Sequence, residues 1–517
     1  MSQKWLSGVV VVALFLASCA GRPLFAADHF LTIGGGYSPH GNQVSLEKNV
    51  LFFQTLLGKL NLTGSPHDIF FSDGDSPARD LQFVDPTHQV PRVNRVLAQL
   101  FGKEDDLEAS FRTHQVPGIR GGSSPENLDR WFDEVGKTLH GGDRLVIYMT
   151  GHGGKGQDMQ NPHFYMWQRR QWPMKEFVTR LDKLDPQVQV VLVMVQCYSG
   201  GFANCIFNEG DFKKGVTGAN RCGFYATVHN RPAAGCTPDI DEENYQEYSS
   251  SFWSAICGQT RTGQPVAPPD YDGDGRVSFN EAHAFTVLTS NTIDIPVKTS
   301  DAFLRAVSKT KDDNVQDLIT ADASYDTLEQ LASPVERSLL QGLSQVLELS
   351  GTERTKGARD LAANLEKERG AVNIEKKKLM GDYGRLRQMI AESLKLRWPE
   401  LDNPWHPQVM EEVSREGNEI VAAVEGHPKY SEFAKLHDQI SERSTKALDL
   451  ERRWVKCQRF VHLTENVALA ANLAKVATTE LQARYQALVR SEAGTLCGPD
   501  NAGPEPTPTS IEEVPAQ

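Results

Sequence analysis

The sequence predicts an α/β fold in which a mostly parallel sheet carries helices on both faces and is followed by an elongated all-α region. In the first half of the chain, short and nearly continuous apolar runs alternate with helical patterns, which is typical of parallel strands buried on both faces. After about Ser333 glycine becomes rare, and apolar residues recur at the three-, four- and seven-residue spacings of long amphipathic helices.

The first half supplies strands and helices in alternation. Strands are predicted at His29–Ile33, Asp68–Phe71, Arg144–Met149 and Gln189–Val195, and helices around Leu46–Leu60, Asn127–Leu139 and Met174–Leu184. Residues 72–120 interrupt this rhythm and are predicted to form an insertion. The insertion contains the sequence Thr-His-Gln-Val-Pro twice, at Thr87–Pro91 and Thr113–Pro117, but two short copies do not define a repeat architecture.

The last third of the chain is predicted to form an elongated helical hairpin, coiled coil or bundle. Helices are predicted around Leu361–Leu394, Pro407–Val424 and Lys429–Arg490, with Pro399 and Pro404 breaking the pattern between the first two. The predicted units are a linker at 301–332, a helical domain at 333–496 and a disordered, Pro/Glu-rich tail at 497–517.

The N-terminus has the pattern of a secretory signal. Residues 1–18 contain Lys4 and then an apolar run that is too short to span a bilayer. The end of this segment, with Cys19, resembles the lipobox of bacterial lipoproteins, which implies that Cys19 is lipidated and that the protein is anchored at the periplasmic or cell surface. The alternative is ordinary cleavage near Ala27, which would give a secreted protein.

Composition and charge exclude several classes of protein. Of the 517 residues, 39% are hydrophobic, which excludes a mostly disordered chain. The net charge is −13, from 54 Lys and Arg against 67 Asp and Glu, so a nucleic-acid partner is not expected. Since no other apolar run approaches spanning length, contact with a membrane is expected only through the N-terminal lipid.

The cysteines are expected to be partly paired, because export would place them in an oxidising compartment. Of the eight cysteines, Cys19 and Cys197 are set aside for other roles. The remaining six fall into two groups, and pairing is expected within each group with open connectivity. These groups are Cys205, Cys222, Cys236 and Cys257 in the first, and Cys457 and Cys497 in the second.

Two glycine-rich turns that follow predicted strands carry reactive side chains. His152 lies in Gly-His-Gly-Gly and Cys197 in Gln-Cys-Tyr-Ser-Gly-Gly. Reactive residues of open α/β sheets lie beyond the carboxyl ends of the strands. A thiol can pass its proton to an imidazole, because the thiolate is the nucleophile, and the imidazole can then protonate a leaving amine. Neither a nucleophile-elbow serine motif nor a His-Glu-x-x-His zinc motif is found.

Over residues 28–300 this pattern resembles the caspase/legumain clan of cysteine peptidases. The resemblance implies a caspase-like sheet, with Cys197 as nucleophile, His152 as general acid/base, and an oxyanion hole formed by the backbone N–H groups of Gly153 and Cys197. It also implies protein or peptide substrates. Several clan members have an acidic residue or Gln two positions before the cysteine, where this chain has Val195, so P1 specificity is left open.

The segment Phe224–His229 resembles the next core strand of this clan, whose end lines the substrate cleft. Thr227 and His229 are therefore candidate substrate-binding residues, the alternative being ordinary strand and loop positions. Legumains also have a helical C-terminal segment that covers the cleft until it is processed, which raises the possibility that the helical domain restrains the enzyme.

Residues 270–281 fit the twelve-residue EF-hand calcium loop. The predicted ligands are the side chains of Asp270, Asp272 and Asp274, the carbonyl of Arg276, Ser278 directly or through water, and Glu281 through two oxygens. Gly275 occupies the turn position. A second EF-hand is not found, so Ca²⁺ is expected to act as a structural clamp rather than as a paired sensor. The alternative is an acidic surface loop.

Two functions follow from these observations. The first is an exported, calcium-binding cysteine endopeptidase that uses a Cys197/His152 dyad. The alternative is a catalytically inactive, caspase-fold calcium-binding protein that acts as a scaffold through its helical domain.

Overall fold

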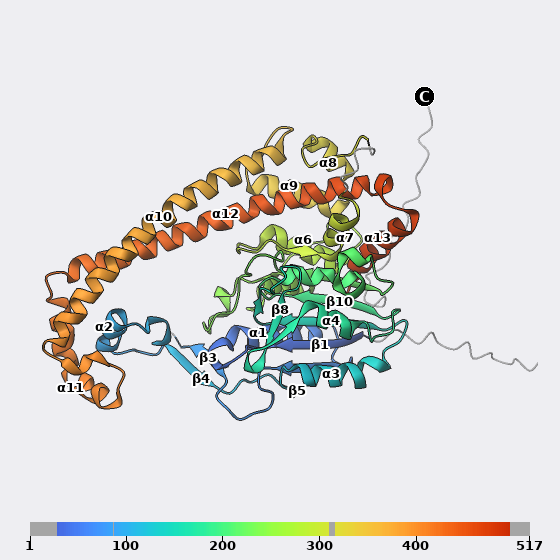
Figure 1. Ribbon diagram of the computed structural model, residues 1–517. Helices are drawn as coiled ribbons and strands as arrows, with labels where there is room; N and C mark the ends of the chain where they lie inside the picture. The colour runs from blue at the N-terminus through green and yellow to red at the C-terminus, as the bar shows by residue number, and fades with distance from the viewer. Residues whose placement is uncertain (1–27, 86, 310–315, 497–517) are drawn as a thin grey trace, which may run out of the picture.

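The computed structural model describes residues 28–85, 87–309 and 316–496 (Figure 1). The predicted signal 1–18, Cys19 and the tail 497–517 lie outside the described residues. The main sheet has seven strands in the order β12-β11-β10-β6-β1-β2-β5, and all neighbouring pairs are parallel except β11 and β12. This confirms the predicted α/β fold class with a mostly parallel sheet.

Strands β1, β2, β6 and β10 of the main sheet match the apolar runs of the sequence, β11 overlaps the segment Phe224–His229, and β5 and β12 were not predicted. The strands of this sheet are β1 Asp28–Gly34, β2 His67–Phe71, β5 Ile119–Gly121, β6 Arg144–Thr150, β10 Gln189–Met194, β11 Arg221–Tyr225 and β12 Val297–Lys298. Two small antiparallel sheets are formed by β3 Leu81–Val84 with β4 Ala109–Arg112, and by β7 Gly153–Gly154, β8 His163–Met166 and β9 Arg170–Pro173. The central strands are fully buried, as their continuous Val, Leu, Ile and Met content predicts.

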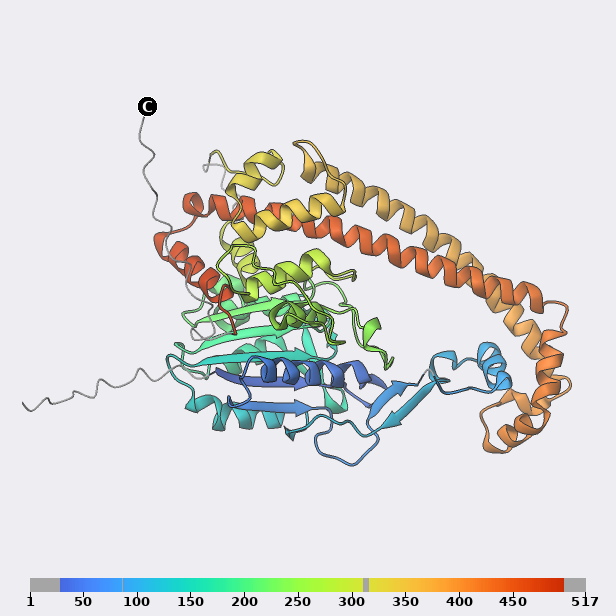
Figure 2. The same cartoon turned by 180° about the vertical axis from the view of Figure 1, so that it is seen from behind.

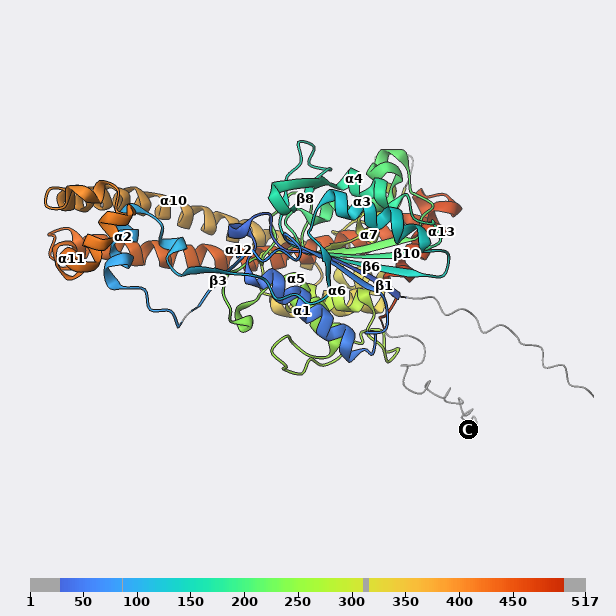
Figure 3. The ribbon, with the colours of Figure 1, turned by 90° about the horizontal axis from the view of Figure 1, so that it is seen from below.

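Helices cover both faces of the main sheet. The helices of the first 310 residues are α1 Val44–Lys59, α2 Arg92–Phe101, α3 Pro125–Glu134, α4 Met174–Leu181, α5 Tyr248–Cys257, α6 Phe279–Thr289 and α7 Thr299–Val307. Figure 3 shows α3 and α4 on one side of the strands and α1, α5 and α6 on the other. The 3₁₀ helix η5, Ser199–Ile206, follows β10 and packs against β11.

The rest of the described chain is helical. Its helices are α8 Tyr325–Leu331, α9 Pro334–Val346, α10 Arg354–Lys395, α11 Pro407–Glu425, α12 Tyr430–Val476 and α13 Thr479–Glu492. We refer to α10, α11 and α12 together as the arm. Helices α10 and α12 lie side by side over most of their length, and the arm extends well away from the sheet (Figures 1 and 2). No helix in the described ranges is both long enough and apolar enough to cross a membrane.

The insertion 72–120 contacts the far end of the arm. Helix α2 lies against α10 and α11, where Val93 and Leu97 are buried in one apolar cluster with Ile390 and Val413 (Figure 2). The arm therefore contacts the rest of the protein at both of its ends.

Two segments that were predicted to lie outside the α/β domain, α7 and α13, pack against its main sheet. Part of the range expected to be a linker, 301–332, forms α7, and Phe303 and Leu304 are buried in the main core. The long helix expected to reach Arg490 ends at Val476, because Thr478 caps a new helix by accepting a hydrogen bond from the backbone N–H of Leu481. This helix, α13, returns to pack against β10 and β11.

The described cysteines are all free thiols. They are Cys197, Cys205, Cys222, Cys236, Cys257 and Cys457. The disulfides expected within the first group are therefore not formed in this structure, while Cys19 and Cys497 lie outside the described residues. Cys205 is fully buried, and its Sγ lies 3.5 Å from the hydroxyl of Tyr225.

Candidate functional site

The ends of two adjacent strands bring the turns of His152 and Cys197 into contact. Strands β6 and β10 are parallel neighbours, and the backbone N–H of Val195 donates to the carbonyl of Met149 at 3.1 Å. A Cβ atom at Gly153 would lie 2.1 Å from the carbonyl oxygen of Cys197. Only glycine allows this approach, so the close contact between the two turns requires a glycine directly after the histidine. The two backbone N–H groups expected to form the oxyanion hole therefore belong to touching turns.

The imidazole of His152 is mostly buried and is oriented by the loop that precedes α1. Its Nε2 lies 2.7 Å from the carbonyl oxygen of Gly41 and 3.1 Å from Oε1 of Gln43, and Tyr37 packs edge-to-face on the ring at 5.1 Å. Burial lowers the pKa of His152, with the Gly41 carbonyl opposing it. Because a carbonyl can only accept, the neutral ring carries its proton on Nε2, which leaves Nδ1 able to accept a proton.

The thiol of Cys197 is half-buried beneath residues 231–236, which we call the covering segment. The backbone N–H of Ala233 donates to Sγ at 3.3 Å. Burial raises the pKa of Cys197, and the negative charge of Asp294 raises it further. Among the described residues, no hydrogen bond joins Cys197 to His152. The thiol is therefore protonated and covered in this conformation.

The covering segment is held from two sides. The side chain of Arg231 donates to Glu451 on α12 at 2.7 Å and lies over the ring of Trp454 at 4.9 Å. On the other side, the backbone N–H of Ala234 donates to Oδ1 of Asp294 at 2.7 Å. The conformation over Cys197 thus depends on contacts with the arm and with the loop that follows α6.

Asp294 was not identified from the sequence. It is 1% exposed, and its Oδ2 has no hydrogen-bond partner among the described residues. Burial raises its pKa to about 7. No motif marks this position, since it lies in an ordinary loop whose placement beside Cys197 is a result of the tertiary fold.

The two predicted substrate-binding residues lie in different surroundings. Thr227 is fully buried and joins η5 to the end of β11, because its N–H donates to Oγ of Ser199 and its carbonyl accepts from Gly200. His229 instead lines a cavity of about 620 Å³ between η5, the covering segment, α7 and α12. Both remain predicted substrate-binding residues, but in this conformation only His229 faces open space.

The cavity beside His229 has an excess of positive charge that the sequence did not indicate. Its ionisable lining residues are Arg231, Lys298, Arg305 and Lys309, the histidines His229 and His462, and the single acid Asp301. Burial lowers the pKa of His229, and the positive charge of Arg305 lowers it further. Lys298, Asp301, Arg305 and Lys309 follow one another at the spacing of one face of α7, whereas His229, Arg231 and His462 reach the cavity from other elements, and no local pattern could have joined them to this face.

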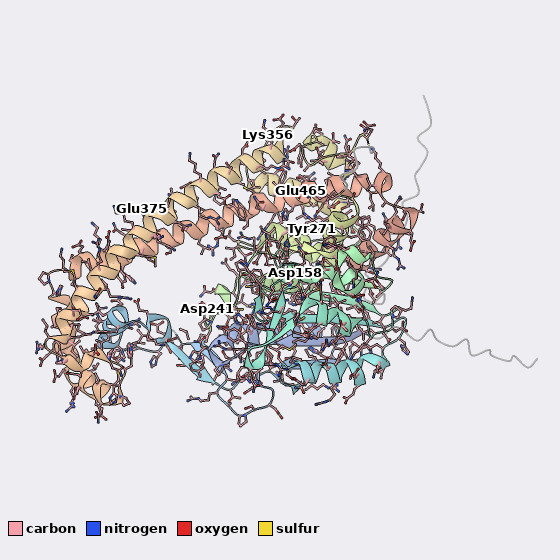
Figure 4. The ribbon with its side chains drawn as sticks, viewed as in Figure 1. Asp158, Asp241, Tyr271, Lys356, Glu375 and Glu465 are labelled. Atoms are coloured by element: carbon pink, nitrogen blue, oxygen red, sulfur yellow. The ribbon has the colours of Figure 1, made fainter. Side chains whose placement is uncertain are left out.

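The predicted EF-hand loop brings together three of its predicted ligands. Carboxylate oxygens of Asp270, Asp272 and Glu281 lie within 4.8 Å of one another. Gly275, with φ of +82°, donates its N–H to Oδ2 of Asp270 at 2.9 Å, which explains the glycine at the turn position. Tyr271 (Figure 4) donates its N–H to Oε1 of Glu281 at 2.7 Å.

Of the other predicted ligands, the carboxylate of Asp274 lies outside this group of three, whereas Oγ of Ser278 donates to Oε2 of Glu281 at 2.9 Å. Asp274 is exposed, and its Oδ1 accepts the N–H of Arg276 at 2.8 Å. Ser278 forms a capping box with Glu281 at the start of α6. All of the predicted ligand atoms are oxygens, and they occupy the loop positions that supply ligands in an EF-hand. The residues therefore fit Ca²⁺.

Comparisons with known proteins give little further information. No family model matches the chain, and no curated protein matches it. Among solved structures, protein GSU0716 from Geobacter sulfurreducens is similar over 50% of this chain and 88% of its own, with 9% sequence identity and a TM-score of 0.28. The function must therefore be inferred from the residues of this chain.

Proposed function

We propose that this protein is a calcium-binding cysteine endopeptidase of the caspase/legumain type that cleaves protein or peptide substrates. The observation that carries the proposal is the contact of two glycine-rich turns at adjacent strand ends, one with a thiol and one with a neutral imidazole oriented by Gly41. Export, with lipid attachment at Cys19 as the only contact with a membrane, is part of the same proposal and concerns residues outside the described ranges.

The proposed reaction uses the protonation state that the surroundings of His152 favour. Sγ of Cys197 attacks the scissile carbonyl carbon while its proton passes to Nδ1 of His152. The oxyanion accepts from the N–H groups of Gly153 and Cys197. Collapse breaks the C–N bond as His152 protonates the leaving amine, and water activated by His152 then hydrolyses the thioester. The covering segment must first move, since the Ala233 N–H occupies Sγ.

A bound Ca²⁺ would neutralise the clustered carboxylates and fix the start of α6. The other end of this helix lies near the proposed dyad. The buried side chain of Arg459 donates to the carbonyls of Val287, Ser290 and Asp294, and Asp294 in turn holds the covering segment. The order of the calcium loop is therefore linked to Cys197 through one helix and one loop.

Cleavage of a diverse peptide library tests the proposal. The wild type, Cys197→Ala and the matched control Cys257→Ala are each compared with Ca²⁺ and with a chelator. Cys257 is another half-exposed thiol, at the end of α5. We expect cleavage by the wild type and by the control only, with lower activity in chelator. Cleavage by Cys197→Ala would overturn the proposed dyad.

A catalytically inactive scaffold is the second candidate, and the covered, protonated thiol favours it. A peptidyl electrophile distinguishes the two functions, because only an enzyme needs a reactive thiolate at Cys197. Absence of labelling at Cys197 under every condition, together with absence of cleavage, would favour the scaffold.

A further inference from the structure

A second group of ligand-type side chains lies apart from the calcium loop. Asp73 follows β2, Asp80 precedes β3 and His114 follows β4, and their ligand atoms all lie within 4.8 Å of one another. We call these residues the insertion cluster. Asp73 and Asp80 come from the loop that joins β2 to β3, and the pairing of β3 with β4 brings His114 to them from more than 30 residues further along the chain.

The insertion cluster is buried and incompletely satisfied. Asp80 is 1% exposed, and the side chains of Asp73 and His114 are 9% and 5% exposed. Oδ1 of Asp73 and Nδ1 of His114 are buried, and neither has a hydrogen-bond partner in the described part of the chain. No lysine or arginine among the described residues forms an ion pair with either carboxylate. Two buried carboxylates without a fixed cation are unfavourable unless a proton or a metal ion neutralises them.

The imidazole of His114 has an unsatisfied lone pair in either neutral tautomer. Nε2 lies 2.6 Å from the carbonyl oxygen of Gly74 and 3.9 Å from Oδ1 of Asp73. If Nε2 carries the proton, it donates to Gly74 and leaves the lone pair of Nδ1 without a donor. If Nδ1 carries the proton, the lone pair of Nε2 faces two oxygen atoms. A cation fits the first arrangement, since it accepts the electron pair of Nδ1 together with those of the carboxylate oxygens while Nε2 still donates to Gly74.

The charges within the cluster give the same indication. Two carboxylates in one buried site repel each other, which a divalent cation between them would reverse.

We propose that Asp73, Asp80 and His114 bind a divalent cation of the Zn²⁺ class. The donor set favours Zn²⁺ over Ca²⁺, because Ca²⁺ takes six to eight oxygen ligands whereas Zn²⁺ takes about four from imidazole nitrogen and carboxylate oxygen. The site does not depend on the proposed peptidase activity, and it shares no residue with the calcium loop.

The bound cation orders the loop that orients His152. Asn42 donates to Oδ2 of Asp80 at 3.0 Å, and its own Oδ1 accepts the N–H of Gly36 at 3.0 Å. The neighbouring carbonyl of Gly41 holds Nε2 of His152. The insertion cluster therefore lies one side chain away from the loop that sets the imidazole, and its metal has a positioning role.

The repeated sequence Thr-His-Gln-Val-Pro provides a matched control. Its second copy places His114 in the insertion cluster, whereas His88 of the first copy is exposed to solvent and lies outside the cluster. Replacing either histidine by glutamine makes the same chemical change in the same local sequence, so a difference between the two variants reports on the cluster alone.

The test is a Zn²⁺ titration of the chelator-treated full chain against a chromophoric competitor. The variants are Asp80→Asn, His114→Gln, His88→Gln and Asp270→Asn, the last of which removes a ligand of the predicted calcium loop, and Asp73→Asn is compared with the wild type in stability. We expect one Zn²⁺ site in the wild type, affinity lower by at least about 10-fold in His114→Gln and Asp80→Asn, because loss of a ligand costs no less than loss of an outer partner, and unchanged affinity in His88→Gln and Asp270→Asn. If Asp80→Asn does not fold, the comparison of His114→Gln with His88→Gln decides the question.

Several results would overturn the proposal. Equal Zn²⁺ affinity in the wild type and His114→Gln would place the metal elsewhere, and loss of binding in Asp270→Asn would assign it to the calcium loop. Absence of Zn²⁺ binding, with Asp73→Asn more stable than the wild type at pH 7, would show that the carboxyls share a proton instead. Binding of Ca²⁺ alone at these residues would refute the proposed metal class.

Discussion

The covering segment over Cys197 is tied to the arm by Glu451 and Trp454, so removing these two side chains should make the thiol more reactive. The ion pair from Arg231 to Glu451 is 2.7 Å long, and its side chains are 18% and 28% exposed. A pair of this exposure contributes about 0.5–1 kcal/mol, and a cation–π contact such as that of Arg231 with Trp454 adds about 0.5–1 kcal/mol.

Together these contacts favour the covered conformation by about 1–2 kcal/mol. The double variant Glu451→Ala/Trp454→Ala should therefore raise the population with an accessible thiol by about 5- to 30-fold. The assay is the rate of iodoacetamide labelling at Cys197, followed by mass spectrometry of the unreduced protein. The rate should rise by the same factor, because labelling needs the open conformation.

The matched control is Glu375→Ala. Glu375 (Figure 4), on α10, forms an ion pair with Arg443 on α12, and this pair does not touch the covering segment. Glu451 also bonds Arg369 on α10 at 3.3 Å, and circular dichroism of both variants checks that the arm remains folded. A labelling rate within two-fold of the wild type in the double variant, with the arm intact, would refute the proposed restraint.

Three further predictions concern stability. Glu492, 1% exposed, accepts from Lys298 at 2.8 Å, so Glu492→Ala should lower the free energy of unfolding by about 3 kcal/mol in urea, and a loss below about 1 kcal/mol would contradict this. The pKa of Asp294 is raised to about 7, against about 4 in an unfolded chain, so the wild type should lose stability as pH rises between these values. Asp294→Asn should lack that loss when denaturation curves are measured at pH 5 and 7.5. An equal change in the free energy of unfolding in the wild type and the variant would contradict the raised pKa of Asp294. Calcium at about 100 times its Kd should stabilise the wild type by about 3 kcal/mol but not Glu281→Gln, as thermal melting can show.

The central strands and the two glycine-rich turns were predicted because both have local signals in the sequence. Strands β6 and β10 are continuous apolar runs, and the turns that follow them contain glycines that a close backbone contact requires. The apolar periodicity predicted a long helix at Leu361–Leu394, and the observed α10, Arg354–Lys395, begins seven residues earlier and ends one residue later. Local pattern is enough for such features, because each depends on its own neighbours.

Other features have no local signal, since distant residues create them. The antiparallel edge strand β12 has only two residues, Val297–Lys298, and is too short for any periodicity. The covering segment reads as an ordinary loop, and its position over Cys197 depends on Arg231 reaching a helix more than 200 positions later. The insertion cluster likewise needs the pairing of β3 with β4 before His114 approaches Asp80.

The contact of α2 with the far end of the arm has a mechanical consequence. A helix pair attached at one end only can swing about that end, whereas a pair attached at both ends is restrained along its whole length. The pair α10 and α12 is supported near the sheet, where Arg459 is buried, and again at α2. A single proteolytic cut in the arm would therefore leave both fragments attached to the protein. Release of the part of α12 that contacts the covering segment would require a second cut or loss of the contact with α2.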